Sequence, residues 1–382
     1  MKLKLEKEQR ILILILILYL FCVVFYISKF DYNLSAFSEL SESNLDLFYG
    51  EIPDNLVVFK NSNGYDGQFY YLMAQDFRNN VDGLRNQRVL YPFISKLLSF
   101  GNDDLIPFTL IYVNLVAILV GTFFFIKILK LFNSNLNYAY LWAFNPGYIL
   151  GFMRNLTEPL MIMFILIGIY LILRKKVALS LIFFVLSTLT REASVVIIFS
   201  ILIFFLAKKE WKNSLYMAVS LVPFLIFNII IYSVYGNTGF LANSSHTTLP
   251  FIGFFNYIKN TDLSLSLKLL IYYLSSVPVF LYALIQGVIL IKDKIINLKD
   301  RFDIFFYLVV FQVISILILQ EFLFKGQICN LGRYGLPLFL FSILYSIRKE
   351  KMHWTLILLL IGMSLFLFIT KVIRFKISYF IT

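Results

Sequence analysis

The side chains best suited to chemistry lie in Tyr65-Asp66-Gly67-Gln68-Phe69-Tyr70-Tyr71, within the longest polar region of an otherwise apolar chain. A carboxylate can accept a proton from a hydroxyl group, so Asp66 is a candidate general base. Aromatic rings stack on sugars, and Tyr65, Gln68 and Tyr71 can hydrogen-bond to hydroxyl groups. We therefore expect Asp66 to be the chemical centre, while Asp-Gly is also a common turn sequence.

Other ionisable residues stand at the ends of apolar segments farther along the chain. They are Arg154, Glu158, Arg191, Glu192, Lys325 and Arg333. Charges at membrane depth are costly, so they normally pair or face a polar cavity. We expect them to form one outward-facing polar site together with Asp66.

Simpler structural roles stay open for several of these residues. Glu158 precedes a proline and would suit the positive end of a helix dipole. Thr190-Arg191-Glu192 would also serve as a capped helix start with an internal ion pair, and Arg333-Tyr334 as an interfacial anchor. The glycines that flank Arg333-Tyr334 predict an accessible guanidinium, which can bind phosphate through two hydrogen bonds.

Cysteine and histidine are too scarce for two common kinds of site. The chain contains only Cys22, Cys329, His246 and His353. These exclude a disulfide framework and a four-ligand zinc site. We interpret His246 as a loop histidine more readily than as a metal ligand.

The composition is that of a polytopic membrane protein, since 60% of the residues are hydrophobic and only 15% are charged. Taking roughly 20 apolar residues per crossing predicts about eleven helical spans in one integral-membrane domain covering residues 1–382. The predicted spans are 11–28, 106–126, 136–152, 159–173, 177–190, 193–207, 214–235, 266–291, 303–322, 334–347 and 354–373.

The net charge of +12 does not indicate a nucleic-acid partner, because the basic residues sit at the ends of spans. More than half of them fall in turns on one side of the predicted topology, and that side is expected to be cytoplasmic, together with the N-terminus. The C-terminal tail is also basic but falls on the opposite side, so its location is open.

Residues 29–105 form the first outer loop, which carries Asp66. Apolar residues recur at helical spacing near 69–77 and again near 89–98. The spacing predicts two amphipathic helices lying on the membrane surface. A second outer loop, at about 236–265, is predicted to dip back toward the bilayer.

The order of these motifs resembles the GT-C class of integral-membrane glycosyltransferases over residues 11–350. Tyr65-Asp66-Gly67-Gln68-Phe69-Tyr70 and Gln87-Arg88-Val89-Leu90-Tyr91-Pro92 look like bacterial cell-surface glycopolymer proteins of this class, distantly related to mannosyltransferases. Asn155-Leu156-Thr157-Glu158-Pro159, Leu189-Thr190-Arg191-Glu192 and Gly332-Arg333-Tyr334 extend the likeness. The paired acidic motif of the class is absent, because Asp66 stands alone.

The resemblance implies an all-α bundle of GT-C type in the plasma (inner) membrane, with an extracytoplasmic active site. It would transfer a hexosyl or mannosyl group, with inversion, from a polyprenyl-phosphate donor to a glycan or lipid acceptor. Asp66 would be the general base. Arg333 would bind the carrier phosphate, with Arg191 and Arg154 as alternates.

The other substrate-binding residues that the resemblance implies are Tyr65, Gln68, Tyr71, Arg88, Glu158, Glu192 and Tyr334. Glu158 and Glu192 would pair with the arginines, or one of them would be the base. No cofactor is implied with certainty, and a need for Mg²⁺ or Mn²⁺ is left open.

Two other functions remain as alternatives. A transporter or flippase of a lipid-linked sugar would need polar residues through the bilayer midplane, where the predicted spans have few. A glycan polymerase or ligase would share the outward site but would more typically carry its large polar loop late in the chain.

Overall fold

The computed structural model describes residues 5–47, 53, 55–79, 81, 83–236, 248–260, 281–292, 303–319 and 330–349, and these are mostly helical. The chain divides into two compact units: Met1–Ala139 with Gly151–Ser244, and Tyr140–Leu150 with Ser245–Thr382. The expectations for His246, Lys325, Cys329, His353 and the span 354–373 lie outside the described residues.

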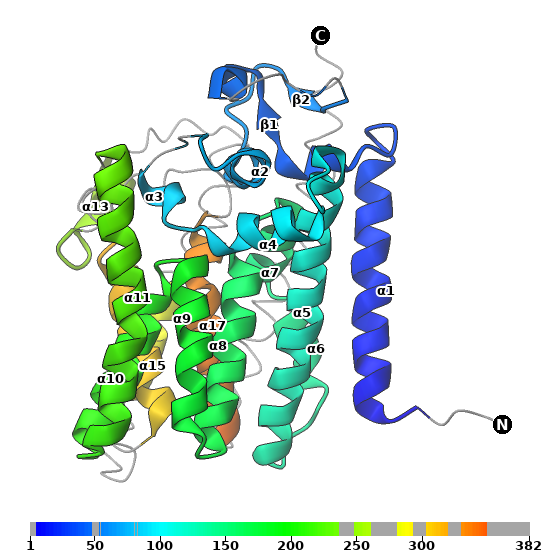
Figure 1. Cartoon of the computed structure of the whole chain (residues 1–382). Helices are drawn as coiled ribbons and strands as arrows, with labels where there is room; N and C mark the ends of the chain where they lie inside the picture. The colour runs from blue at the N-terminus through cyan, green and yellow to red at the C-terminus, as the bar shows by residue number, and fades with distance from the viewer. Residues whose placement is uncertain are drawn as a thin grey trace. The chain divides into compact units, whose positions relative to one another are not determined.

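Long apolar helices make up most of the first unit and run beside one another (Figure 1). They are α1 (Lys7–Ile27), α5 (Ile106–Leu131), α8 (Glu158–Leu173), α9 (Val177–Thr190), α10 (Ser194–Ala207) and α11 (Trp211–Tyr235). The predicted spans 11–28, 106–126, 159–173, 177–190, 193–207 and 214–235 are confirmed as helices.

Of the described helices, three are long and apolar enough to cross a membrane: Lys7–Ile27, Asp103–Leu131 and Trp211–Tyr235. Shorter apolar helices accompany them, including α8, α9 and α10. These helices indicate association with a lipid bilayer. The count of eleven crossings stays a prediction.

α8 lies at the centre of the first unit, since nearly all of its side chains are buried. This burial explains why α8 is apolar on every face. Gly168 lets α9 come close, because an added Cβ would lie 2.7 Å from Cζ of Phe184. Inside a membrane the hydrophobic effect does not drive helices together, because lipid tails are as apolar as the side chains. Small residues then favour helix association, because they let two helices pack closely.

The prediction of one continuous span over 136–152 was wrong. The segment forms two short helices, α6 (Tyr138–Ala143) and α7 (Pro146–Met153). Pro146 has no N–H to continue a helix, and the side chain of Asn145 accepts a hydrogen bond from the Gly147 backbone N–H at 3.0 Å. A polar turn therefore replaces the middle of the expected span.

The first outer loop contains the two predicted helices, α2 (Gly67–Gln75) and α4 (Leu90–Leu98). It also contains features that the hydrophobic pattern did not predict. These are the 3-10 turns η1 (Leu34–Ser38), η2 (Glu42–Leu47) and η3 (Asp103–Leu105), the helix α3 (Gly83–Asn86), and the strands β1 (Leu40–Ser41) and β2 (Val58–Phe59). β1 and β2 pair in parallel, with Leu40 opposite Val58.

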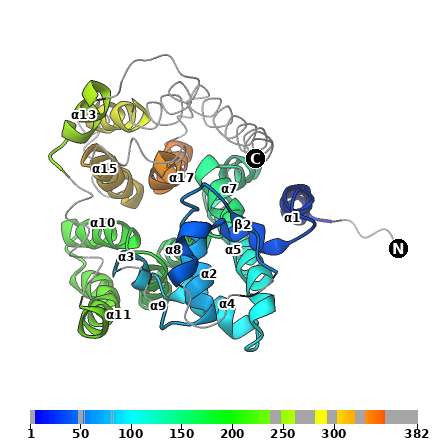
Figure 2. The same cartoon turned by 90° about the horizontal axis from the view of Figure 1, so that it is seen from above.

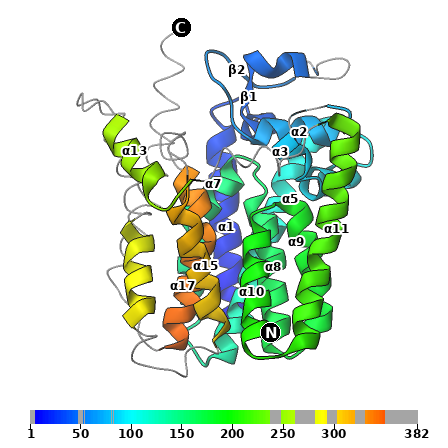
Figure 3. The same ribbon diagram turned by 90° about the vertical axis from the view of Figure 1, so that its left-hand side faces the viewer.

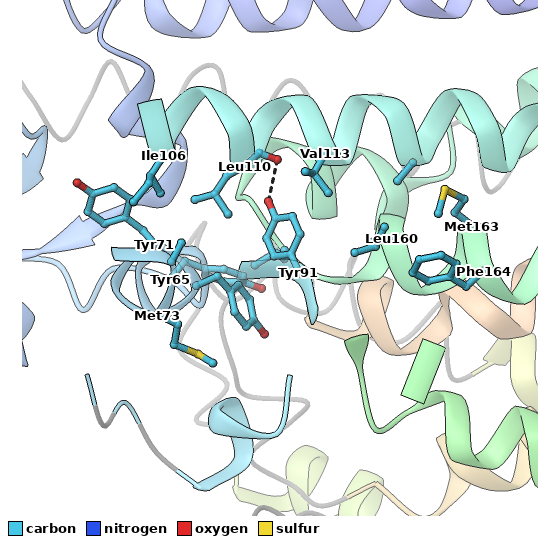
Figure 4. Close-up of a cluster of buried hydrophobic side chains, with 14 of the residues drawn as sticks. Tyr65, Tyr71, Met73, Tyr91, Ile106, Leu110, Val113, Leu160, Met163 and Phe164 are labelled. Carbon is cyan, nitrogen blue, oxygen red and sulfur yellow. Dashed lines mark hydrogen bonds between the residues drawn. The ribbon is translucent and has the colours of Figure 1, made fainter. Parts of the chain in front are cut away.

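The expectation that both loop helices lie on the membrane surface stays a prediction for α4, which exposes Phe93 and Leu97. α2 is buried on most sides. Tyr71 and Met73 of α2 join an apolar cluster with Ile106 of α5 and Leu160 of α8 (Figure 4). α2 is thus part of the core, because its aromatic residues extend around the helix instead of along one stripe.

The loop covers one end of the first unit's helices. Seen from above, α2 and α4 lie over the ends of α5 and α8 (Figure 2), and β1 and β2 lie beyond α2 (Figure 3). α4 packs against α5 and α9. The hydroxyl of Tyr235, the last residue of α11, donates to the Phe77 carbonyl at 2.8 Å. The loop is therefore fixed to helices from both early and late parts of the chain.

The basic turns of the first unit lie at the opposite end from this loop. They include Lys127 and Lys130 near the end of α5, Arg174-Lys175-Lys176 after α8 and Lys208-Lys209 after α10. Lys130 pairs with Glu8 at the start of α1. This separation agrees with the expected topology, and the assignment of the basic end to the cytoplasm stays a prediction.

The second unit contains α13 (Ile252–Asn260), a helix at Leu281–Lys292, α15 (Ile304–Leu317) and α17 (Asn330–Arg348). The spans 303–322 and 334–347 correspond to α15 and α17, which pack together. The span 266–291 is described only from residue 281. The backbone N–H groups of Thr248 and Phe251 donate to carbonyls at the end of α15. The second outer loop thus returns to α15, and its depth in the bilayer stays a prediction.

The topology predicts opposite labelling at two exposed positions. In a variant without native cysteines, Ser62→Cys in the outer loop should react with a membrane-impermeant maleimide added to intact cells. Lys212→Cys at the start of α11 should react only after the cells are opened. Labelling in the reverse pattern would contradict the proposed orientation.

Candidate functional site

Arginine–carboxylate pairs gather where α8 and α10 begin and α9 ends. We call the set the ion-pair belt, and it comprises Asp66–Arg85, Glu39–Arg154, Glu192–Arg88 and Glu158–Arg191. Since each guanidinium faces a carboxylate, the belt is electrically balanced. The structure brings together the predicted residues of the first unit, and the outward orientation of the site stays a prediction.

Asp66 directly precedes α2, and its side chain does not cap that helix. Arg85 donates to Oδ1 of Asp66 from Nε at 3.2 Å and from Nη2 at 2.7 Å. The guanidinium carbon of Arg85 also lies 4.2 Å from the ring centre of Phe69. A turn residue would need none of these contacts, so the arrangement favours a role for the carboxylate itself.

Arg154 fixes the other side of the same turn. Its guanidinium lies 3.9 Å from the ring centre of Tyr65 and 3.2 Å from a carboxylate oxygen of Glu39. Gly67 touches the same residue, because an added Cβ would lie 2.2 Å from the Arg154 carbonyl oxygen. The first turn of α2 is therefore pressed against the chain between α7 and α8.

Arg88 binds Glu192 through two hydrogen bonds, of 2.8 Å from Nε and 2.6 Å from Nη2. Its Nη1 donates to the Tyr70 hydroxyl at 2.9 Å. Burial alone would raise the pKa of Glu192, but Arg88 and Arg191 together lower it to about 2. Glu192 is thus held as an anion, which makes it a poor general base near neutral pH.

Arg191 binds Glu158 at 2.8 Å, and only 4% and 1% of these two side chains are exposed. Glu158 begins α8, so its carboxylate also lies at the positive end of the helix dipole. The close partner of Arg191 is thus Glu158, whereas the capped-start interpretation expected its neighbour Glu192. The Glu158–Arg191 pair thus joins α8 to the turn between α9 and α10, and the Arg88–Glu192 pair joins the outer loop to the same turn.

The structure places Gln68 and Tyr71 inside the loop. The Gln68 amide accepts from the Ser41 backbone N–H at 2.9 Å and donates to the Asn63 carbonyl at 3.2 Å. The Tyr71 hydroxyl accepts from Gln75 at 3.0 Å, and burial raises its pKa above the ordinary value. Both side chains therefore take part in the loop's own hydrogen bonding.

Arg333 and Tyr334 belong to the second unit, where they lie near the start of α17. The expectation of an accessible Arg333 guanidinium was wrong, because only 6% of the residue is exposed. The flanking glycines are part of the helix and so do not open a loop around it.

Sequence reasoning missed Arg85, Glu39 and Asn114 as parts of this region. Asn114 donates to the Tyr91 hydroxyl at 2.9 Å and to the Leu156 carbonyl at 3.0 Å. Tyr91 in turn donates to the Leu110 carbonyl (Figure 4). A polar residue within an apolar span was the available signal for Asn114. Nothing in the local sequence distinguishes Arg85 or Glu39 from other loop charges.

The belt does not resemble a divalent-metal site. Among the residues that the structure describes, no group of three His, Cys, Asp or Glu side chains is placed to hold a metal ion. Each belt carboxylate already faces a guanidinium, whereas Mg²⁺ and Mn²⁺ prefer several oxygen ligands with uncompensated charge. We therefore assign no step to a metal at these carboxylates.

No protein-family model, curated protein or solved structure matches this chain.

Gly67→Ala should destabilise the first unit, because the added methyl group would clash with the Arg154 carbonyl oxygen. This oxygen belongs to the backbone and cannot move aside as the end of a flexible side chain could. We expect a loss of about 1–3 kcal/mol, the usual range for overpacking, measured by thermal unfolding in detergent. Gly287→Ala is the control, since its nearest contact would be an ordinary 3.5 Å to Val313. Equal melting temperatures for the two variants would contradict the close packing at Gly67.

Glu192→Gln should destabilise the protein far more than Asp76→Asn. Losing Glu192 leaves the buried Arg88 charge without its carboxylate, which costs about 3–5 kcal/mol. Asp76 pairs with Arg78, whose side chain is 66% exposed, and such pairs contribute about 0–1 kcal/mol. Similar melting temperatures for the two variants would contradict a structural role for the Arg88–Glu192 pair.

The Arg88–Glu192 pair also predicts that the stability of the protein depends on pH. Because folding lowers the pKa of Glu192, its stabilisation is complete above 4.5 and is lost as the pH falls toward about 2. The difference in melting temperature between wild type and Glu192→Gln should therefore shrink across this window.

Proposed function

We propose that this chain is a membrane glycosyltransferase that moves a sugar from a polyprenyl-phosphate donor to a glycan or lipid acceptor, with Asp66 as general base. The observation that carries the proposal is the position of Asp66. It lies in a polar loop over the ends of apolar helices, within a group of arginines that suits a phosphate-bearing lipid.

Exposure favours Asp66 over Glu158 and Glu39 as the base, and the hydrogen bonds of Glu192, which is 18% exposed, favour Asp66 over it. The Asp66 and Arg85 side chains are 19% and 25% exposed. Glu158 and Glu39 are 1% and 8% exposed, and Glu192 is bound on both oxygens by Arg88. An acceptor hydroxyl could therefore approach Asp66 with the least rearrangement.

The arginines differ in what they can contribute. Arg88 and Arg191 are 3% and 4% exposed, and their contacts suit a structural role. Arg85 contacts Asp66 directly, and Arg154 stacks on the neighbouring Tyr65. These two are better placed than the buried pair to stabilise negative charge on a leaving phosphate, which is commonly the largest catalytic term.

The local hydrogen bonding of the helices argues against a transport path through the first unit. Ser180, Ser187, Ser200, Ser220 and Asn228 each donate to a carbonyl of their own helix. Such side chains do not provide the inward-facing polar groups that a translocated solute needs. A one-sided enzyme agrees better with these contacts than a flippase does.

The test is sugar transfer from synthetic polyprenyl-phosphate sugars in proteoliposomes, comparing wild type, Asp66→Asn and Asp76→Asn at matched protein amounts. Asp66→Asn should lower transfer by about a hundredfold or more, the usual scale for removal of a general base. Asp76→Asn, a change of the same kind in the same loop, should keep wild-type transfer.

Other outcomes redirect the proposal. Unchanged transfer by Asp66→Asn would assign the base elsewhere, with Glu158 as the next carboxylate to replace. Absence of transfer by wild type from every donor tried, combined with uptake of a labelled lipid-linked sugar, would favour the transporter.

A further inference from the structure

We infer that Arg85 is a shared partner: it binds the Asp66 carboxylate in the resting enzyme and the phosphate of a prenyl-phosphate ligand after transfer. This inference deepens the proposed function and rests on it. It replaces Arg333 with Arg85 as the residue that binds the carrier phosphate.

Arg85 is the most accessible guanidinium of the belt. Its side chain is 25% exposed, compared with 13% for Arg154, 4% for Arg191 and 3% for Arg88. A ligand that approaches the belt would therefore meet Arg85 before the other arginines. A guanidinium binds carboxylate and phosphate through the same planar set of N–H donors. Arg85 can therefore exchange one anion for the other while keeping the same hydrogen-bond geometry.

Phe69 supports Arg85 independently of its carboxylate partner. The guanidinium carbon lies 4.2 Å from the ring centre, a distance typical of a cation–π contact. Phe69 belongs to α2, and Asp66 directly precedes the same helix. The ring can therefore hold Arg85 beside Asp66 while the anionic partner changes.

The charge balance of the reaction matches such an exchange. The acceptor O–H gives its proton to Asp66 and its oxygen bonds to the anomeric carbon, while the bond from that carbon to the phosphate oxygen breaks. Asp66 loses one negative charge and the prenyl phosphate gains one. A guanidinium in contact with both groups has an anionic partner before and after transfer, first Asp66 and then the phosphate. No charge is therefore left unpaired in this partly buried site.

The structure thus makes Asp66 a competitor of the phosphate for Arg85. Removing the Asp66 charge should strengthen phosphate binding, although the same change is expected to abolish transfer. A carboxylate that merely held the loop in place would give the opposite result, because its loss would loosen the site.

The experiment measures equilibrium binding of farnesyl phosphate, farnesol and inorganic phosphate to the purified full-length protein in detergent at pH 7.5. Asp66→Asn should bind farnesyl phosphate roughly tenfold more tightly than wild type, and Arg85→Gln roughly tenfold more weakly, as expected for one charge-assisted contact. Farnesol, which lacks the phosphate, should bind all three proteins equally.

The double variant Arg85→Gln/Asp66→Asn separates competition from simple repulsion. If Asp66 competes for Arg85, replacing Asp66 should improve binding much less when Arg85 is absent. An equal improvement in both backgrounds would overturn the inference. So would unchanged binding by Arg85→Gln or an equal response to farnesol.

Matched controls come from the exposed pair in the same loop. Asp76→Asn and Arg78→Gln remove an aspartate and an arginine that also bind each other, at a separate position. Both should bind farnesyl phosphate as wild type does. If Arg85→Gln fails to fold, Arg85→Lys takes its place, and its melting temperature shows whether it is folded. Arg85→Lys should bind farnesyl phosphate with an affinity between those of wild type and Arg85→Gln.

Inorganic phosphate distinguishes the source of the anion. A response to both phosphates supports a general phosphate site, and a response to farnesyl phosphate alone supports a lipid-phosphate site. Binding is measured without a sugar donor, so it is independent of the transfer assay. If the variants bind farnesyl phosphate as expected but the wild type transfers no sugar, the phosphate-binding role of Arg85 is kept and the glycosyltransferase function is rejected.

Discussion

The pairing of arginine with carboxylate at the end of the first unit is the constraint on which the rest of this structure depends. Arg88 and Arg191 are almost fully buried, and a buried guanidinium is tolerated only beside an anion with good hydrogen bonds. Glu158 supplies one anion from the start of α8, and Glu192 supplies the other from the turn between α9 and α10. The position of the outer loop over the helices follows from where these charges can be satisfied.

The exposure of the arginine side chains within the belt separates structural pairs from the pair suited to chemistry. The innermost pairs join helices and loop, and the outermost pair, Asp66–Arg85, keeps contact with solvent. A rigid inner layer that supports an accessible outer pair is the arrangement that precise positioning requires. The belt thus combines a structural joint with a candidate reaction centre.

Helices were predicted well from the sequence because hydrophobic length alone defines them. The span 177–190 coincides with α9, and the start of α5 at Ile106 was also correct. The failure at 136–152 arose where Asn145 and Pro146 interrupt a run that is apolar on average. Burial of α2 was missed because its aromatic residues suit a surface helix as well as a core helix.

The pairing partners in the site could not be predicted, because they are set by tertiary contacts over long separations. Arg88 and Glu192 are 104 residues apart, and Asp66 and Arg85 are 19 apart with a separate helix between them. The motifs indicated that Arg191 and Glu158 matter, and geometry was needed to show that they bind each other. Arg85 carried no signal at all in the sequence.

The hydrogen bond from Tyr235 to Phe77 and the pairing of Arg88 with Glu192 also constrain how the protein assembles. The ribosome makes the outer loop long before it makes α10 and α11. During that interval Arg88 has not yet met its carboxylate, and the loop has no partner beyond the early helices. Closing the loop over the bundle is therefore a late event in biogenesis, and a chain that stops before residue 192 would expose an unfinished, charged surface to quality control.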